Sequence, residues 1–116
     1  MFPPHCIKGT EEHQIIPELA PYAADRLEKS RYSAFHNTDL AHRLAALKPQ
    51  KVVLCGVCTD ICVLHTAADA RNRDYIVEVP TDAVATFDPQ AHQWALRHME
   101  KILGVRLTTA SALVGT

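Results

Sequence analysis

The strongest pattern along the chain lies in residues 51–70, where a short apolar run precedes a longer helical one. The apolar, mostly β-branched run at residues 52–54 ends close to Gly56, as is typical of a buried strand. Beyond the turn, apolar side chains recur around a helical period, with Thr59 or Asp60 in position to cap the helix. The stretch therefore predicts a strand, a tight turn and a buried helix.

Helical and strand patterns alternate along the rest of the chain from residue 38 onward. The predicted elements are a helix over residues 38–47 stopped by Pro49, a strand over residues 75–79 after a turn at residues 72–74, a helix over residues 88–103 that starts at Asp88-Pro89 and is closed by Gly104, and a strand over residues 105–108. Short connections between such elements favour a parallel sheet with helices on both faces. We therefore predict an α/β fold with three layers, α/β/α.

The first 35 residues predict little regular structure. Two prolines and Gly9-Thr10 indicate a loop over residues 2–10, and residues 11–19 predict a short helix or turn. Residues 26–35 are irregular in pattern but contain inward candidates, so we expect a short strand and a loop there. This part of the chain carries motifs rather than strong periodicity.

Length and composition limit the class of protein. The 116 residues, 47% of them hydrophobic, are enough for one domain with a modest core. A net charge of −1, spread without blocks, gives no basic surface for nucleic acid or an anionic membrane, so small molecules or proteins are the expected partners. We find no apolar run of membrane-spanning length and no secretory pattern in MFPPHC, and we expect a cytoplasmic protein with reduced cysteines.

Cys62 is the candidate nucleophile because it falls near the start of the predicted helix. Unpaired N–H groups and the positive end of the helix dipole favour a thiolate at such a position. A buried structural cysteine is the simpler interpretation of any one cysteine in a core segment. Cys55 and Cys58 form a C-x-x-C between strand and helix, which is the placement of a thioredoxin-like redox pair. A thioredoxin-like pair is accompanied by a proline at the start of a later strand. Pro80 instead follows the predicted strand, which disfavours this interpretation.

Several motifs together resemble the isochorismatase-like cysteine hydrolases, and most closely the nicotinamidases. The matching segments are Phe2-Pro3-Pro4-His5 with Gly9-Thr10, Lys29-Ser30-Arg31-Tyr32-Ser33-Ala34-Phe35 with Thr38-Asp39-Leu40, Gly56-Val57-Cys58-Thr59-Asp60-Ile61-Cys62-Val63 with Thr66-Ala67, Asp82-Ala83-Val84-Ala85-Thr86-Phe87, and His92-Gln93-Trp94-Ala95-Leu96. The resemblance extends from residue 2 to about residue 108. It implies an isochorismatase-like α/β/α fold with Rossmann-like topology.

The resemblance also implies catalytic roles. Cys62, in the D-x-C-V motif, would be the nucleophile, and Lys29, in K-x-x-Y-S-x-F, the catalytic lysine. The bond between Val57 and Cys58 would be a cis peptide, and the backbone N–H groups of Cys58 and Cys62 would form the oxyanion hole. The implied reaction converts nicotinamide and water to nicotinate and ammonia through a thioester on Cys62.

Substrate and metal contacts are implied for the start of the chain. Phe2 stands where the family places an aromatic ring against the substrate, and His5, in P-x-H, matches one of three protein ligands of a divalent metal, which would be zinc, manganese or iron. One histidine in a loop is a weak metal site without such context. The resemblance further implies a homo-oligomer.

One part of the family pattern has no match in residues 1–116. The family's first strand with its catalytic aspartate, and a following D-x-H metal pair, precede the P-x-H segment. We therefore expect a single domain over residues 1–116 that is incomplete at its N-terminus, lacks a central strand and has impaired activity. Asp60 and Asp69 lie on the nucleophile's own helix and are interpreted as capping and surface residues. A metal site formed by Cys58, Cys62 and His65 would require Cys58 to be helical, which its place before the cap disfavours.

Three alternatives to a nicotinamidase stay open at this point. The first is another isochorismatase-like hydrolase of small amides. The second is a thiol redox protein that uses Cys55 and Cys58, and the third is a non-catalytic domain that packs against a partner. Reactivity of the individual cysteines and activity on small amides distinguish these classes.

Overall fold

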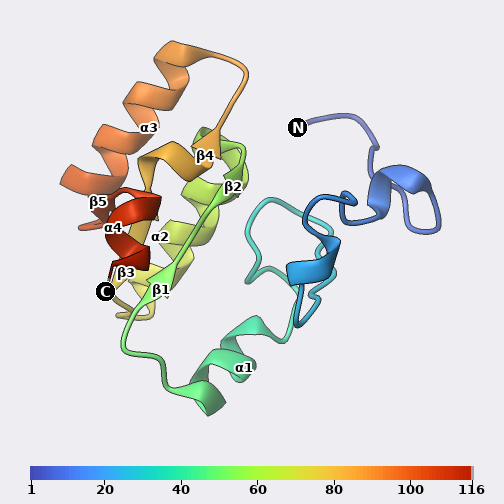
Figure 1. The fold of residues 1–116 in the computed structure, drawn as a ribbon, viewed down its shortest axis with the longest axis horizontal. Coiled ribbons are helices and arrows are strands. Elements are labelled where there is room, and N and C mark those ends of the chain that lie inside the picture. The colour runs from blue at the N-terminus through green and yellow to red at the C-terminus, as the bar shows by residue number, and fades with distance from the viewer. Residues whose placement is uncertain (116) are drawn as a thin grey trace.

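The computed structural model describes residues 1–115. Its helices are α1 (Leu40–Leu47), α2 (Leu64–Asn72), α3 (Pro89–Lys101) and α4 (Ala110–Val114), and its strands are β1 (Val52–Val53), β2 (Gly56–Val57), β3 (Val77–Pro80), β4 (Val84–Ala85) and β5 (Arg106–Thr108). A π-helical segment, η3 (Thr59–Val63), leads directly into α2, and short 3₁₀ turns are η1 (Glu11–His13), η2 (Ala20–Tyr22) and η4 (Thr81–Ala83). Figure 1 shows the arrangement of these elements.

The strands form two small parallel sheets. One has the order β1-β3-β5, and the other pairs β2 with β4. In the larger sheet Val52 pairs with Val77, and Val79 pairs with Leu107. The predicted α/β fold with a parallel sheet is confirmed. The central position belongs to β3, whose Val77 and Val79 are fully buried, whereas β1 lies at an edge of the described sheet.

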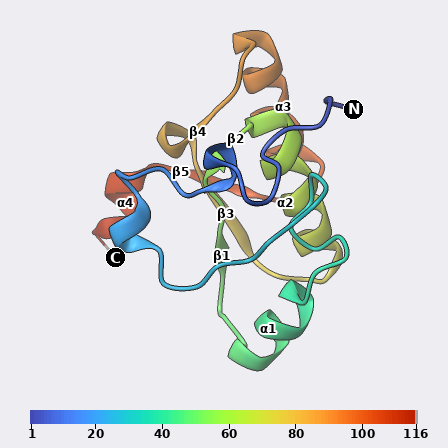
Figure 2. The ribbon, with the colours of Figure 1, turned by 90° about the vertical axis from the view of Figure 1, so that its right-hand side faces the viewer.

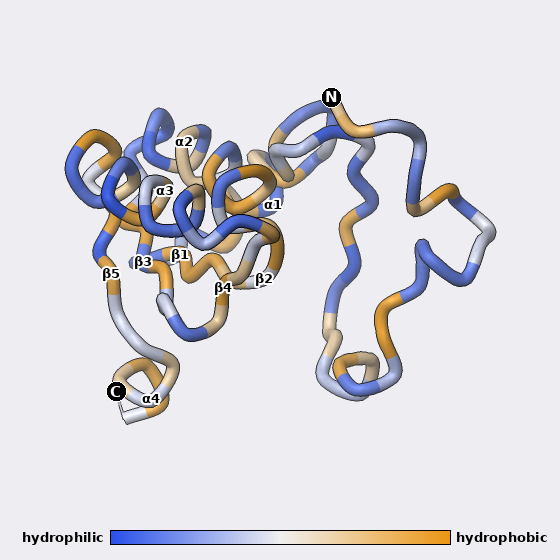
Figure 3. The backbone as a smooth tube through the Cα atoms, turned by 90° about the horizontal axis from the view of Figure 1, so that it is seen from above, coloured by the Kyte–Doolittle hydropathy of each residue, from blue (hydrophilic) through white to orange (hydrophobic). Residues whose placement is uncertain are grey.

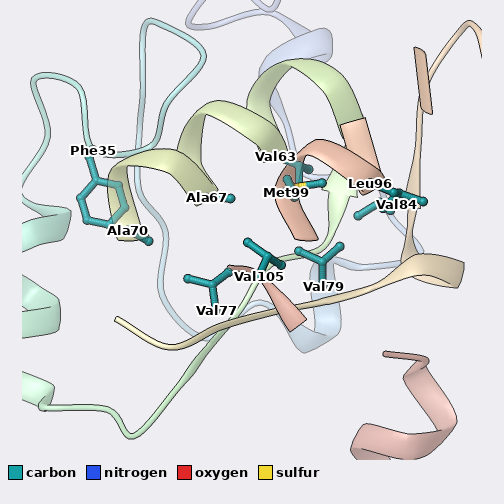
Figure 4. Close-up of a cluster of buried hydrophobic side chains, with 10 residues drawn as sticks. All are labelled: Phe35, Val63, Ala67, Ala70, Val77, Val79, Val84, Leu96, Met99 and Val105. Atoms are coloured by element: carbon teal, nitrogen blue, oxygen red, sulfur yellow. The ribbon is translucent and has the colours of Figure 1, made fainter. Parts of the chain in front are cut away.

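The main core lies between this sheet and two helices. Seen from above, α2 and α3 cover one face of the strands, and the short α4 lies on the opposite side (Figure 3). The close-up in Figure 4 shows the shared cluster of Phe35, Val63, Ala67, Ala70, Val77, Val79, Val84, Leu96, Met99 and Val105. Alanines on α2 let that helix lie close to the strands, while Met99 of α3 fills the space between them and is fully buried. Burial of α2 against β3 and α3 holds the nucleophile segment in place.

The start of α2 differs from the sequence prediction. Neither Thr59 nor Asp60 caps the helix; Cys58 precedes the helical segment, and no side chain caps it. Thr59 Oγ1 instead lies 2.8 Å from His92 Nδ1, and Asp60 Oδ1 accepts a hydrogen bond from Thr86 Oγ1 at 2.7 Å. These partners come from distant segments, so local capping rules did not predict them.

Other boundaries follow the predicted signals closely. Asp88 caps α3 by accepting a hydrogen bond from the Gln90 N–H at 2.9 Å, and Gly104 after the helix has a φ of 70°. Gly56 has a φ of 107°, a conformation that favours glycine, and it is the first residue of β2. The short α4 was not predicted; Thr109 caps it by accepting from the Ala112 N–H.

Residues 1–39 form a long irregular segment that contains η1 and η2. Figures 1 and 2 show it as a wide loop on the β1 side of the sheet. The strand predicted within residues 26–35 is wrong, because this segment contacts α2 through side chains rather than a strand ladder. Ser33 and Phe35 are its buried residues. Among residues 1–115, no helix has the length and apolar character needed to cross a membrane.

Candidate active site

Lys29 and Cys62 meet in the structure although 33 positions separate them. Lys29 Nζ lies 3.5 Å from Cys62 Sγ and also donates a hydrogen bond to the Arg31 carbonyl at 3.0 Å. Lys29 is on the exposed irregular segment, and Cys62 is half-buried on η3. An ammonium group at this distance stabilises a thiolate electrostatically. The contact places a cationic side chain against the candidate nucleophile.

The turn before Cys62 has an unusual backbone. The peptide bond between Val57 and Cys58 is cis, which is the geometry that the family resemblance implied there. The Cys58 carbonyl accepts hydrogen bonds from the N–H groups of Ile61 and Val63, each at 3.1 Å. Cys62 thus lies in the π-helical segment rather than in the first turn of α2, but it remains at the N-terminal end of the continuous helical stretch.

Aromatic rings gather around Phe2. Its ring centroid lies 6.5 Å from that of Tyr32 and 6.2 Å from that of Phe87, and its N–H donates to the Tyr32 hydroxyl at 3.1 Å. Tyr32 in turn lies 5.6 Å from the His65 ring. Phe2 is 48% and Phe87 81% exposed, so both rings are accessible from solvent. The sequence pointed to Phe2 alone as a substrate contact; Tyr32 and Phe87 were visible only as motif residues.

His5 does not lie in a ready metal site. Its Nδ1 is 2.7 Å from the Pro3 carbonyl oxygen, and its ring packs edge-on against Phe2 at 6.0 Å. Within residues 1–115, no three His, Cys, Asp or Glu side chains gather in a way that could hold a metal ion, and this includes Cys58, Cys62 and His65. The described residues therefore do not fit a divalent metal on their own.

Two aspartates that were interpreted as capping and surface residues have specific partners. Asp60 Oδ1 accepts a hydrogen bond from Oγ1 of Thr86, the residue after β4. Asp69 Oδ2 accepts a hydrogen bond from Ser33 Oγ at 2.5 Å. Both aspartates are half-buried. Their interpretation as capping and surface groups is wrong, because residues far away in sequence supply their hydrogen-bond donors.

The cysteines of the C-x-x-C pattern lie on either side of β2. Cys55 is exposed and Cys58 half-buried, and the four cysteines, all within the described residues, are free thiols. Cys62 differs from Cys55 in having the charged Lys29 side chain beside it. Cys55 is only more exposed to solvent.

Comparison with known proteins identifies the family and the fold of the chain. The model of the isochorismatase domain matches residues 1–111. The isochorismatase family protein PncA of Bacillus subtilis is 43% identical over 115 residues, covering 92% of this chain and 63% of that protein. The crystal structure of nicotinamidase PncA from Bacillus subtilis superposes with a TM-score of 0.85 at 42% identity, over 92% of this chain and 63% of that one.

Two further structures show the chemical range of similar proteins. N-carbamoylsarcosine amidase from Thermoplasma acidophilum has a TM-score of 0.81 at 39% identity, covering 91% of this chain and 60% of that one. Pyrazinamidase of Pyrococcus horikoshii in complex with zinc has a TM-score of 0.80 at 32% identity, covering 94% and 63%. The chain thus spans less than two thirds of the length of these relatives.

Proposed function

The chain belongs to the isochorismatase family, and on that premise we propose that it acts as a nicotinamidase-type cysteine amidohydrolase. The observation that carries the proposal is the 3.5 Å contact between Lys29 Nζ and Cys62 Sγ. It is supported by the place of Cys62 at the N-terminal end of the helical stretch and by the aromatic rings around Phe2. The substrate class is a small aromatic amide, with nicotinamide as the first candidate.

In the proposed reaction the Cys62 thiolate attacks the amide carbon. A carbon–sulfur bond forms, and the carbonyl electron pair moves to oxygen, where the N–H groups of Cys58 and Cys62 are proposed to stabilise the negative charge. Collapse of this intermediate breaks the carbon–nitrogen bond, and the nitrogen leaves as ammonia after it takes up a proton. Water then hydrolyses the thioester and restores the thiol. Lys29 holds the thiolate in position through its charge.

The proton transfers need an acid–base group. The resemblance assigns them to an aspartate that has no counterpart at a matched position in residues 1–116, and Asp60 and Asp69 are engaged with Thr86 and Ser33. The proposed roles are therefore confined to Cys62, Lys29 and the backbone donors. Nucleophile and oxyanion stabilisation are the part of the chemistry that we assign to this chain.

For the complete family reaction we propose a divalent metal with His5 as one ligand, a ligand set that residues 1–115 do not complete. The zinc-bound pyrazinamidase supports a metal in similar proteins. The proposed steps assign no role to a metal, because the described residues do not gather into a ligand set. A cytoplasmic location and a homo-oligomeric state complete the proposal and rest on the sequence patterns and the resemblance.

The test is ammonia release by the natural gene product, including any residues encoded in frame before Met1. We expect turnover of nicotinamide that falls by about 10³-fold or more in Cys62→Ala, and by about 10²-fold in Lys29→Ala. Cys55→Ala is the matched control and should retain activity. Equal turnover by Cys62→Ala would exclude the proposed nucleophile.

A second candidate substrate class is supported by the similarity to N-carbamoylsarcosine amidase. The same cysteine chemistry would act on a carbamoyl nitrogen instead of a ring carboxamide. Comparing kcat/KM for nicotinamide and N-carbamoylsarcosine, with the Phe2→Ala variant alongside, distinguishes the two. Preference for nicotinamide that depends on Phe2 supports the aromatic amide, and preference for N-carbamoylsarcosine supports the alternative.

A further inference from the structure

Four contacts in a row join residues 29–35 to one side of the nucleophile's helical stretch. On the helical side the contacts come from Cys62, Thr66, Asp69 and Arg73, spaced by four, three and four residues, which places them on one face. On the loop side they come from Lys29, Ala34, Ser33 and Phe35. We call these four contacts the seam.

The shortest polar contact of the seam is the hydrogen bond between Ser33 and Asp69. Ser33 is 9% exposed, and its hydroxyl donates to Asp69 Oδ2 at 2.5 Å. Ser33 Oγ also accepts a hydrogen bond from the Phe35 N–H at 3.2 Å, so one side chain links the loop backbone to α2. A hydroxyl bonded to a carboxylate is a charge-assisted hydrogen bond, which is stronger than a neutral one. This contact therefore fixes where the loop sits along the helix.

The backbone next to Ser33 is held on both sides. The Ala34 N–H donates to Thr66 Oγ1 at 3.0 Å, and the Ala34 carbonyl accepts from Thr38 Oγ1 at 2.5 Å. Thr66 is 7% exposed and lies one helical turn after Cys62. At the far end, the Arg73 guanidinium carbon lies 4.5 Å from the centre of the Phe35 ring. The seam thus anchors the loop along about three helical turns, from Cys62 to Arg73.

Lys29 lies on the loop side of the seam, where its ammonium group contacts the Arg31 carbonyl and Cys62 Sγ. It is exposed, and residues 29–39 contain no helix or strand that would fix its backbone. Three residues separate it from Ser33, so displacement of Ser33 displaces the base of the lysine side chain. We infer that Ser33 and Asp69 are positioning residues that hold Lys29 Nζ against Cys62 Sγ. This inference rests on the proposed function of the Lys29 and Cys62 pair.

The test measures the rate of Cys62 alkylation by iodoacetamide, followed by peptide mapping, across the neutral pH range in the natural gene product. Lys29→Ala should slow alkylation of Cys62 by about tenfold, because it removes the cation that lies 3.5 Å from the attacking sulfur. Asp69→Ala should slow it about three- to tenfold and move the pH–rate profile toward that of Lys29→Ala. Asp69→Asn keeps an oxygen that accepts the Ser33 hydroxyl and should stay near the wild-type rate.

A double variant separates positioning from a general structural effect. Asp69→Ala added to Lys29→Ala should cause no further slowing, since the lysine is already absent. Ser33→Ala removes the same hydrogen bond from the loop side and serves if Asp69→Ala folds poorly. Asp82→Ala is the matched control, because Asp82 accepts a hydrogen bond from the Ala110 N–H at 2.8 Å and its partner lies at the start of α4, far along the chain from both site residues.

Each outcome decides between the two claims. If Lys29→Ala leaves Cys62 alkylation unchanged, the proposed function loses its central observation. If Lys29→Ala slows it and neither Asp69→Ala nor Ser33→Ala does, the positioning role alone is overturned. Equal slowing by Asp69→Ala with and without Lys29 also overturns it, since the effect would then not pass through the lysine.

Discussion

Thr59 Oγ1 lies 2.8 Å from His92 Nδ1 and joins the first residue of the nucleophile segment to the first turn of α3. Thr59 is fully buried and His92 is half-buried. A buried hydroxyl without a partner is costly, so the two side chains depend on each other. The bond ties the position of Cys58 and Cys62 to the packing of α3.

Thr59→Val keeps the shape of the side chain and removes its hydroxyl. We expect a loss of about 1–2 kcal/mol in the free energy of unfolding, measured by urea denaturation. His92→Ala should cost a similar amount. The double variant should lose less than the sum of the two, and simple additivity would contradict a direct contact.

Arg71 binds backbone carbonyl groups that follow the C-terminal ends of α2 and α3. Its Nε donates to the Leu103 carbonyl at 2.6 Å, and Nη1 donates to the Tyr75 carbonyl at 2.7 Å. Arg71→Ala should lower the free energy of unfolding by about 1.5–3 kcal/mol, because two carbonyls lose a charged donor. Arg71→Lys should recover only part of this, since an ammonium cannot reproduce the planar fork.

The matched control for Arg71 is Arg97→Ala, at an exposed position on α3. Its effect on the free energy of unfolding should stay within about 0.5 kcal/mol, as for most surface substitutions. A loss at Arg97 equal to that at Arg71 would show that removal of positive charge, rather than the two carbonyl contacts, determines the change.

Cys62 should react with iodoacetamide faster than Cys55 at neutral pH, although Cys55 is the more exposed thiol. The reason is the Lys29 ammonium 3.5 Å from Cys62 Sγ, because the thiolate is the reactive form. Peptide mapping after brief labelling measures the order. Preferential labelling of Cys55 and Cys58, with a reversible disulfide between them, would favour the redox alternative.

The β1 edge should promote self-association. Val53 is 42% exposed, and the N–H groups of its neighbours Val52 and Leu54 donate to the Ile76 and Glu78 carbonyls on the β3 side. Exposed strand edges pair readily with other chains. Sedimentation velocity should show concentration-dependent oligomers that Val53→Lys reduces, because a charged edge residue opposes pairing. A monomer at all concentrations would contradict this prediction.

Zinc should bind to the 116-residue chain no more tightly than to its His5→Ala variant. Residues 1–115 bring no three candidate ligands together, and one imidazole is a weak site. Metal retained after gel filtration, measured by elemental analysis, tests this. Stoichiometric zinc that is lost in His5→Ala would show that His5 has partners which the structure does not bring together.

Local signals in the sequence determined much of this protein. The periodicity predicted α1, α2, α3 and the strands of the main sheet, because apolar spacing is dictated by which face each element buries. Asp88 and Gly104 marked the ends of α3 for equally local reasons, a side-chain cap and a left-handed residue. Motif matches also identified Lys29 and Cys62 as a pair before any distance was known.

Only the tertiary structure decided how the site is held together. Thr59 and Asp60 have the composition of helix caps, yet their hydrogen bonds go to His92 and Thr86, more than 25 positions away. From the sequence, Asp69 is a helix residue that faces solvent. In the structure it accepts a hydrogen bond from Ser33, which lies 36 positions earlier in the chain. Such partners are brought together by the packing of α2 against the sheet and the loop, and packing between distant segments leaves no periodic signal in the sequence.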